Sequence, residues 1–265
     1  MYKLTLLISV FFFSLIVKAE KAVTIQSTTS LKNSGFYDYI IPFIYKDLDI
    51  KIYVVAVGTG AAIRNSMNCD GDLLIVHSPP LEKLFISQGY ANKSYYLMHN
   101  YFIVIGPKND PAEINNSYNI KDIFKKTFKT KSYFVSRGDN SGTHIREKEI
   151  WKDIGLNPLV YSGEWYLQTG TNMGATINTA VGLNAYTFTD KATWIAFKNK
   201  LNYKIYTQNE FNLINEYSAL VINNKKCPLT NEAYSLQIIK WLLSNKAKSL
   251  IEKFKKNNQQ LFFIK

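Results

Sequence analysis

The chain has 265 residues, of which 46% are hydrophobic and 20% are charged, so it can bury an ordinary globular core. It carries 32 Lys and Arg against 20 Asp and Glu, a formal net charge of +12. Nucleic acid, an anionic lipid surface or a small anion would each suit such a charge. The basic residues are scattered, which excludes a long basic tail and is typical of a solvated surface.

The first nineteen residues predict export. Lys3 precedes an apolar run over residues 4–17, and Val17-Lys18-Ala19 has the small-x-small pattern of a cleavage site. The run is shorter than the roughly twenty residues of a membrane span, although a retained anchor is the alternative. No cysteine follows the run, which disfavours a lipoprotein. We expect residues 1–19 to be a cleaved signal peptide and the mature protein to be periplasmic.

Removal of residues 1–19 deletes Lys3 and Lys18, so the mature charge is 30 − 20 = +10. Export argues against nucleic acid as a partner. It also permits a disulfide between Cys69 and Cys227, although the sequence leaves their pairing open. The three histidines lack zinc-site spacing, so neither a metal site nor a cofactor is predicted.

Short apolar strands and helices then alternate. Strands are expected at residues 22–26, 49–57, 73–76, 101–105, 133–135, 165–168, 185–187 and 219–222. Helices are expected at residues 35–46, 61–68, 80–88, 120–128 and 144–154. A further helix is expected to end at about residue 182, and one or two more lie within residues 231–254. This order indicates an α/β protein with mainly parallel sheets flanked by helices.

The length of the mature chain fits two lobes. We expect lobe 1 to comprise residues 20–99 plus 228–265 and lobe 2 to comprise residues 100–227, with crossings near 98–103 and 219–222. A monomer is expected.

Four loops between a strand and a helix are rich in Ser, Thr and Gly. They are residues 27–30, 58–60, 136–143 and 169–176. The first N–H groups of a helix lack internal partners and favour an anion, and hydroxyls add further donors. Because such loops gather at the carboxyl ends of strands, the set predicts a site for a tetrahedral oxyanion. Each loop by itself is equally an ordinary helix cap.

Arg137 lies among these donors. Its guanidinium offers fixed, charged donors to an oxyanion, and the alternative is an ion pair with Asp139 or another carboxylate. The chain has neither a phosphate-binding P-loop, nor a dinucleotide fingerprint, nor a nucleophile elbow.

These residues carry a resemblance to a known family. The segments are Ser27-Thr28-Thr29-Ser30, Gly58-Thr59-Gly60, Ser136-Arg137-Gly138-Asp139-Asn140-Ser141-Gly142-Thr143, Trp165-Tyr166-Leu167-Gln168-Thr169-Gly170 and Met173-Gly174-Ala175-Thr176. The chain resembles tungstate-binding proteins of bacterial ABC transporters, relatives of molybdate- and phosphate-binding proteins. One departure is Ser27, where that family usually has Thr, and it keeps the hydroxyl.

The resemblance implies a two-lobed type II periplasmic binding fold that delivers its ligand to a membrane permease. It also implies that the oxyanion is bound, through its oxygens and without a metal ion, by Thr28, Thr29, Ser30, Thr59, Arg137, Ser141, Thr143, Gly174 and Ala175.

Two classes of alternative remain open. Molybdate, phosphate or sulfate would use similar donors, although a phosphate site often needs an acidic acceptor for the ligand's proton. An exported enzyme acting on an anionic substrate would need a base or nucleophile beside the donors, and His77, His144 and Asp139 are the candidates.

The motif Glu113-Ile114-Asn115-Asn116-Ser117 contains Asn-x-Ser preceded by an acidic residue. It resembles the extended acidic sequon of some bacterial N-glycosylation systems. Chance occurrence is the alternative in a chain rich in asparagine.

Overall fold

The computed structural model describes residues 20–207 and 211–265, so the expected signal peptide lies outside the described residues. The strands are β1 (Ala22–Thr28), β2 (Lys51–Val57), β3 (Leu73–Val76), β4 (Tyr95–Pro107), β5 (Phe134–Ser136), β6 (Tyr166–Gln168), β7 (Tyr186–Asp190), β8 (Tyr203–Ile205), β9 (Ile214–Val221), β10 (Lys255–Lys256) and β11 (Gln259–Gln260).

The α-helices are α1 (Thr29–Asn33), α2 (Phe36–Leu48), α3 (Thr59–Met67), α4 (Pro79–Ser87), α5 (Ile120–Thr130), α6 (Gly142–Asp153), α7 (Met173–Gly182), α8 (Lys191–Ala196), α9 (Glu232–Leu242) and α10 (Asn245–Lys253). Three short 3-10 helices are η1 (Ile114–Asn116), η2 (Pro158–Tyr161) and η3 (Phe211–Leu213). None of the described helices is long and apolar enough to cross a membrane.

The main sheet has nine strands in the order β2-β1-β3-β9-β4-β7-β5-β6, with β8 paired to β4. Its two ends are parallel, because β1 pairs with β2 and β3, and β5 pairs with β6 and β7. The antiparallel pairs of this sheet all involve the central strands β9 and β4, and β10 and β11 form a separate antiparallel pair. The predicted α/β class is confirmed, and the expected sheets are joined into one.

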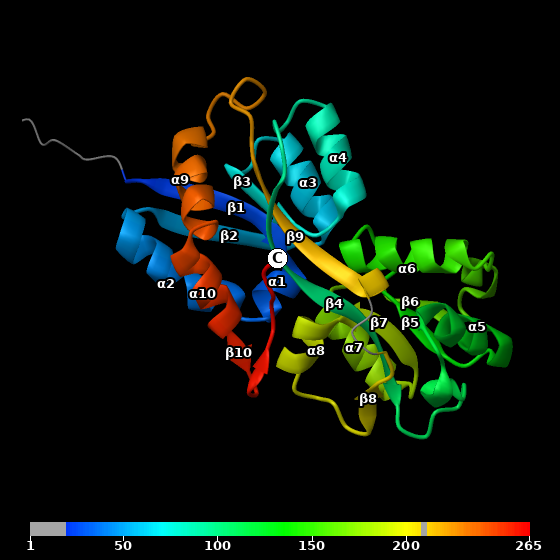
Figure 1. Ribbon diagram of the computed structural model, residues 1–265. Coiled ribbons are helices and arrows are strands. Elements are labelled where there is room, and N and C mark those ends of the chain that lie inside the picture. The colour runs from blue at the N-terminus through cyan, green and yellow to red at the C-terminus, as the bar shows by residue number, and fades with distance from the viewer. Residues whose placement is uncertain (1–19, 208–210) are drawn as a thin grey trace, which may run out of the picture.

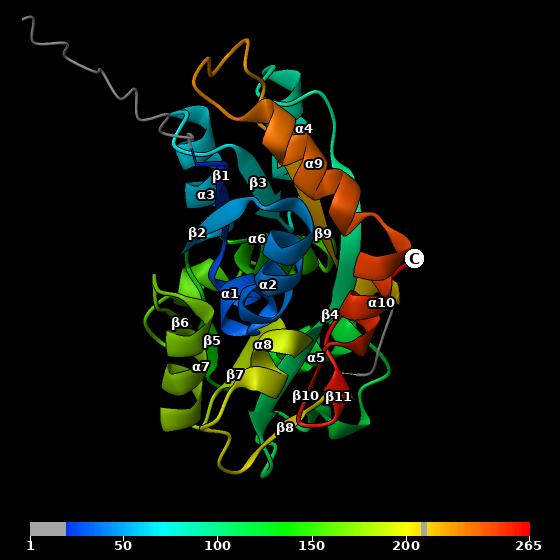
Figure 2. The ribbon, with the colours of Figure 1, turned by 90° about the vertical axis from the view of Figure 1, so that its left-hand side faces the viewer.

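Each end of the sheet is covered by helices on both faces (Figures 1 and 2). Around β1 and β3, one core includes residues of α2, α9 and α10, and another on the opposite face includes residues of α3 and α4. Around β7, the corresponding cores include α5 and α6 on one face and α7 and α8 on the other. Strand β3 is buried along its whole length, as expected of a strand covered on both faces. We call these two ends the first and second halves.

Strands β4 and β9 pass from one half to the other, as Figure 1 shows. They pair with each other from Tyr95–Ala219 to Tyr101–Ile214, and β4 continues beyond this point to pair with β7 and β8. The expected crossings near residues 98–103 and 219–222 lie on these strands. The boundaries of the two lobes, as bodies that move separately, stay a prediction.

The first hydroxyl-rich segment folds differently from the expected loop. Ser27 and Thr28 end β1, and Thr29 begins the short helix α1 directly. The Thr28 Oγ1 accepts a hydrogen bond from the Leu31 N–H at 3.4 Å, so the last residue of the strand also caps the helix. A strand and a helix therefore meet here without an intervening loop.

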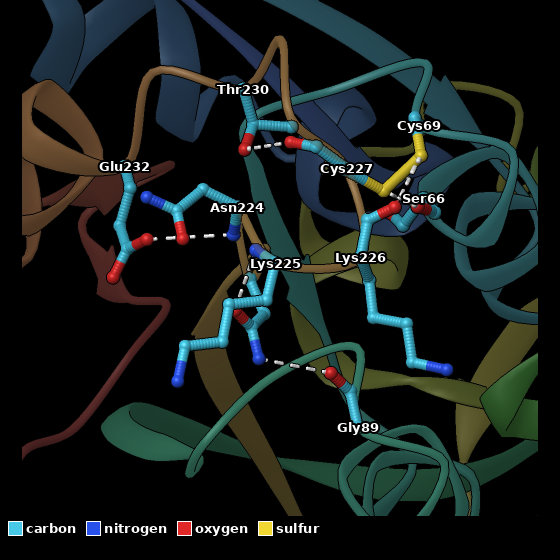
Figure 3. The surroundings of a disulfide bond; sticks show 10 residues. Ser66, Cys69, Gly89, Asn224, Lys225, Lys226, Cys227, Thr230 and Glu232 are labelled. Carbon is cyan, nitrogen blue, oxygen red and sulfur yellow. Dashed lines mark hydrogen bonds between the residues drawn. A yellow bond between two sulfur atoms is a disulfide. The ribbon is translucent and has the colours of Figure 1, made fainter.

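A disulfide joins Cys69 and Cys227, whose Cα atoms lie 5.3 Å apart (Figure 3). Cys69 follows α3 in the left-handed conformation, with φ of 65°, and Cys227 is buried in the loop between β9 and α9. The bond spans 158 residues of sequence and ties the end of α3 to the segment that follows a crossing strand. This settles the pairing that the sequence left open.

We predict that the double substitution Cys69→Ser/Cys227→Ala lowers the free energy of unfolding by about 2–5 kcal/mol, because the unfolded chain regains the freedom of a long loop. Urea denaturation measures the change. A thiol reductant should destabilise the unsubstituted protein and leave the double variant unaffected. Equal stability of the two proteins in the absence of reductant would contradict this role.

Candidate functional site

The first donor cluster lies where β1 and β2 end. Thr28 is opposite Val57 in this parallel pair, so the carboxyl ends of the two strands are adjacent. Helices α1 and α3 begin at this edge, with Thr29 and Thr59 as their first residues. Thr28, Ser30 and Thr59 are buried and Thr29 is half-buried. Two helix N-termini and four hydroxyls therefore lie at one edge of the first half.

The second cluster follows β5 in the second half. The Ser141 hydroxyl caps α6 by accepting a hydrogen bond from the His144 N–H at 3.2 Å. The Ser141 N–H in turn donates to Asp139 Oδ1 at 3.0 Å, which folds the loop before the helix. Ser141 and Thr143 are both buried.

The two clusters face each other directly. The Gly142 N–H donates to Thr59 Oγ1 at 3.2 Å, and the Gly60 N–H donates to the Asn140 carbonyl at 3.0 Å. A Cβ added to Gly60 would lie 2.8 Å from the Asn140 Cβ, closer than real side chains come. The first turn of α3 and the loop before α6 thus meet through backbone that only glycine permits.

Arg137 is 3% exposed, and its Nη2 would lie 3.9 Å from a Cβ added to Gly58, so it reaches the first cluster from the second half. Its Nε donates to the Thr171 carbonyl at 2.6 Å, and its Nη2 forms an ion pair with Asp139 Oδ2. Burial lowers the pKa of the guanidinium while the Asp139 carboxylate raises it, and arginine stays protonated under all ordinary conditions. The ion pair that the sequence left as the alternative is therefore present. It fixes the guanidinium between two loops.

Both Asp139 oxygens are engaged, one by the Ser141 N–H and the other by Arg137. The Nη1 atom of Arg137 has no hydrogen bond to the described part of the chain, so this face of the fork is available to a ligand. Thr143 Oγ1 is buried and has no partner among the described residues. A buried hydroxyl without a partner is costly, and an acceptor in the site would satisfy it.

The loop before α7 reaches the same region. A Cβ on Gly174 would lie 4.0 Å from Nδ2 of Asn33, the last residue of α1. The Ala175 N–H donates to the Asn172 side chain at 3.1 Å, so this amide already has a partner. Sequence reasoning missed Asn172 as a cap, although Asn before a helix is a recognisable signal.

A series of buried, hydrogen-bonded polar side chains runs from the first half of the molecule to the second. His77, at the end of β3, pairs through Nδ1 with Asn215 Oδ1 at 2.8 Å, and Asn215 donates to Asn100 at 2.7 Å. Asn100 donates to Asp190 at 3.1 Å, and Asp190 also accepts from Thr193. Asn100 and Asn215 are directly opposite each other on β4 and β9. This series of hydrogen bonds therefore connects both halves through the two crossing strands.

The His77 ring also supports the site from behind. A Cβ on Gly142 would lie 2.8 Å from the His77 Nδ1 and Cε1 atoms, so the α6 N-terminus packs closely against this ring. Sequence reasoning placed His77 near the site but missed Asn100 and Asn215, because no local pattern joins residues so far apart in sequence.

His144, one of the candidate catalytic residues, is engaged in hydrogen bonds within the second half. Ser136, His144 and Glu147 form a buried network in which Ser136 Oγ donates to Glu147 Oε2 at 2.7 Å and lies 3.0 Å from His144 Nδ1. Glu147 also accepts from the side chains of Trp151 and Tyr166. All five residues are buried, so the network stabilises the second half and presents no nucleophile to solvent.

A cavity of about 420 Å³ opens between the halves beside Gly142. Its lining includes Glu149, paired with Arg146, and Glu216, paired with Lys265, and it includes none of the nine residues predicted to bind the ligand. The chemistry of an oxyanion site therefore lies with the donor clusters. No group of three or more His, Cys, Asp or Glu that could hold a metal ion occurs among residues 20–207 and 211–265.

Comparisons with known proteins agree with this geometry. The PBP superfamily domain matches residues 18–246. The tungstate-binding protein TupA of Peptoclostridium acidaminophilum is 35% identical over 241 residues, 90% of this chain and 83% of that protein. The structure of the tungstate-binding protein TupA from Desulfovibrio alaskensis G20 is 36% identical, with a TM-score of 0.78 over 92% of this chain and 98% of that chain.

The structure described as the tungstate ABC transporter from Geobacter sulfurreducens is 34% identical, with a TM-score of 0.82 over 89% of this chain and all of that chain. The chain therefore belongs to the PBP superfamily and, within it, to the family of the TupA proteins. The resemblance recognised in the sequence is confirmed.

We predict that His77 makes the stability of the protein depend on pH. Burial lowers its pKa below the ordinary 6.5, with the nearby Arg137 charge acting in the same direction and Asp190 opposing it. As the pH falls below about 6.5, His77 becomes protonated in the unfolded chain but stays neutral in the folded protein. The free energy of unfolding therefore falls by up to about 1.4 kcal/mol per pH unit.

The matched variant is His77→Gln, whose amide can still donate to Asn215. Its free energy of unfolding should depend less on pH between 6.5 and 5, whereas His99→Gln, at a less buried site, should change this dependence less. An unaltered slope in His77→Gln would contradict the assignment.

Proposed function

We propose that this protein is an exported solute-binding protein that captures tungstate between its two halves and delivers it to an ABC importer. One observation carries the proposal. Thr59 and Gly60 of the first half contact Gly142 and the loop before it in the second half, and Arg137 lies beside this contact. The names of the relatives, which are tungstate-binding proteins, support the choice of ligand.

The proposed contacts suit an unprotonated dianion. Tungstate carries no proton near neutral pH and needs only donors. Hydroxyls of Thr28, Thr29, Ser30 and Thr143 supply neutral donors, together with amides at the starts of α1, α3 and α7 other than those of Leu31, Gly60 and Ala175, which already have partners. Arg137 supplies one positive charge, of which Asp139 neutralises a part. A protonated phosphate would need a free acceptor, and both Asp139 oxygens are already engaged.

Binding would hold the two halves together. In this account β4 and β9 act as the hinge, and the ligand adds its hydrogen bonds to those between Thr59 and Gly142 and between Gly60 and Asn140. Exclusion of water strengthens each of these bonds. The closed form would be recognised by the permease. The protein itself would carry out no reaction, since the nearby Ser136–His144–Glu147 network is buried and fully engaged.

Titration calorimetry tests this function and the role of Arg137 together. We expect tight stoichiometric binding of tungstate, weaker binding of molybdate, and little binding of sulfate or phosphate. Arg137→Ala should weaken tungstate binding about 100-fold, because it removes charged donors and leaves Asp139 unpaired near the dianion.

The control is Arg146→Ala, which removes a half-buried arginine paired with Glu149 on α6. This variant should bind tungstate as the unsubstituted protein does. Absence of tungstate binding would refute the proposed function, and an unchanged affinity in Arg137→Ala would refute only the role of that residue.

The contact between Gly60 and Asn140 can be tested by a substitution that adds one methyl group. Gly60→Ala should weaken tungstate binding by about tenfold or more, because the new Cβ would meet Asn140 only when the halves are together. Alanine in a helix otherwise stabilises, so any loss of affinity should come from this contact and not from a weaker helix α3.

Gly182→Ala is the matched control, since Gly182 ends α7 and its added Cβ would meet no atom within 4 Å. Equal affinities of the two glycine variants would show that Gly60 and Asn140 do not meet in the ligand-bound protein.

A further inference from the structure

We propose that Asn115 is an N-glycosylation site, modified by transfer of an oligosaccharide from a lipid-linked donor. The motif has Ser117 two residues after Asn115, a residue other than proline between them, and the acidic Glu113 two residues before. The proposal rests on export of the protein and is independent of the ligand that it binds.

The motif lies on the surface in the connection between β4 and α5. This connection is at the end of the second half that is remote from α3, as Figure 1 shows. Glu113, Asn115 and Asn116 are exposed, Ser117 is half-buried, and Ile114 is buried beneath them. A glycan here would extend into solvent and leave the contact between Gly60 and Asn140 unobstructed.

The reacting group is accessible. The Asn115 Oδ1 accepts a hydrogen bond from Lys204 Nζ at 2.6 Å, and Nδ2 has no hydrogen bond to the residues that the structure describes. The Ser117 hydroxyl is likewise without a partner among them. The two side-chain groups that define the motif are therefore not committed to other bonds as donors.

The backbone around Asn115 is held by a few local bonds. Asp110 accepts from the N–H groups of Ile114 and Asn115, at 3.1 and 2.8 Å, and Ser117 N–H donates to the Ile114 carbonyl at 2.9 Å. A local opening of this exposed turn, which must withdraw Ile114 from its buried position, would let the segment extend into the active site of a transferase. The buried Ser117 hydroxyl would become available in the same opening.

The transfer is a simple substitution. The Asn115 Nδ2 forms a bond to the anomeric carbon of the sugar and loses one proton, which passes to water or to the departing pyrophosphate. The bond between that carbon and the pyrophosphate oxygen of the lipid breaks, and the lipid pyrophosphate leaves with the electron pair. No oxidant or reductant is required.

The chain contains a natural comparison in Asn92-Lys93-Ser94, which has the same Asn-x-Ser core. Tyr90, not an acid, stands two residues before Asn92. The Ser94 hydroxyl donates to the buried Glu82 carboxylate at 3.0 Å, so it is committed to the fold. Both differences favour Asn115 over Asn92.

The test is mass spectrometry of the protein recovered from the envelope of the organism that encodes it. The intact mass shows whether residues 1–19 have been removed, and peptide mapping locates any glycan. We expect processed protein with an oligosaccharide on the peptide that contains Asn115 and none on the peptide that contains Asn92. Asn115→Gln and Ser117→Ala should each abolish the added mass, and Asn92→Gln should leave it unchanged.

Processed protein with unmodified Asn115 would overturn the proposal, as would equal occupancy of Asn92 and Asn115. Tungstate titration of Asn115→Gln keeps this result separate from the proposed function, because its affinity should equal that of the unsubstituted protein whether or not the glycan exists.

Discussion

The structure depends on a close approach of backbone to backbone between two helix starts that belong to different halves. The first turn of α3 meets the loop before α6, where Gly60 allows the approach to Asn140, and Gly142 allows α6 to begin directly against His77, because neither glycine has a side chain. The hydrogen bonds formed there are ordinary, about 1 kcal/mol each. Their importance lies in position, since they bring the unpaired amides of two helices to a common point.

The proposed site suits an anion although its own net charge is small. Arg137 is buried and permanently charged, and Asp139 beside it, itself held by the Ser141 amide, neutralises part of this charge. The pair therefore presents a fixed fork of donors with a small net charge. Neutral hydroxyls and amides supply the remaining attraction, which lowers the cost of burying charge when the site is empty.

Much of the fold follows from local sequence. Alternating apolar strands and helices predicted the α/β class, and Gly, Ser and Thr between them predicted where helices begin at the site. Helix α1 was missed because Thr29–Asn33 is too short to show a helical period. The pairing of Arg137 with Asp139 was left open because it depends on the conformation of the short loop that holds both residues, and the Cys69–Cys227 bond was left open because it depends on how the chain returns in space. The His77–Asn215–Asn100 chain was beyond local reasoning for the same reason.

The most direct measurement is a crystal structure of the protein grown with tungstate, because the anomalous scattering of tungsten locates the ion without ambiguity. The account predicts one tungsten position, in contact with Thr59, Arg137 and Thr143, with the two halves closed around it. A tungsten atom in the cavity beside Glu149 and Glu216, or bound to one half alone, would contradict it.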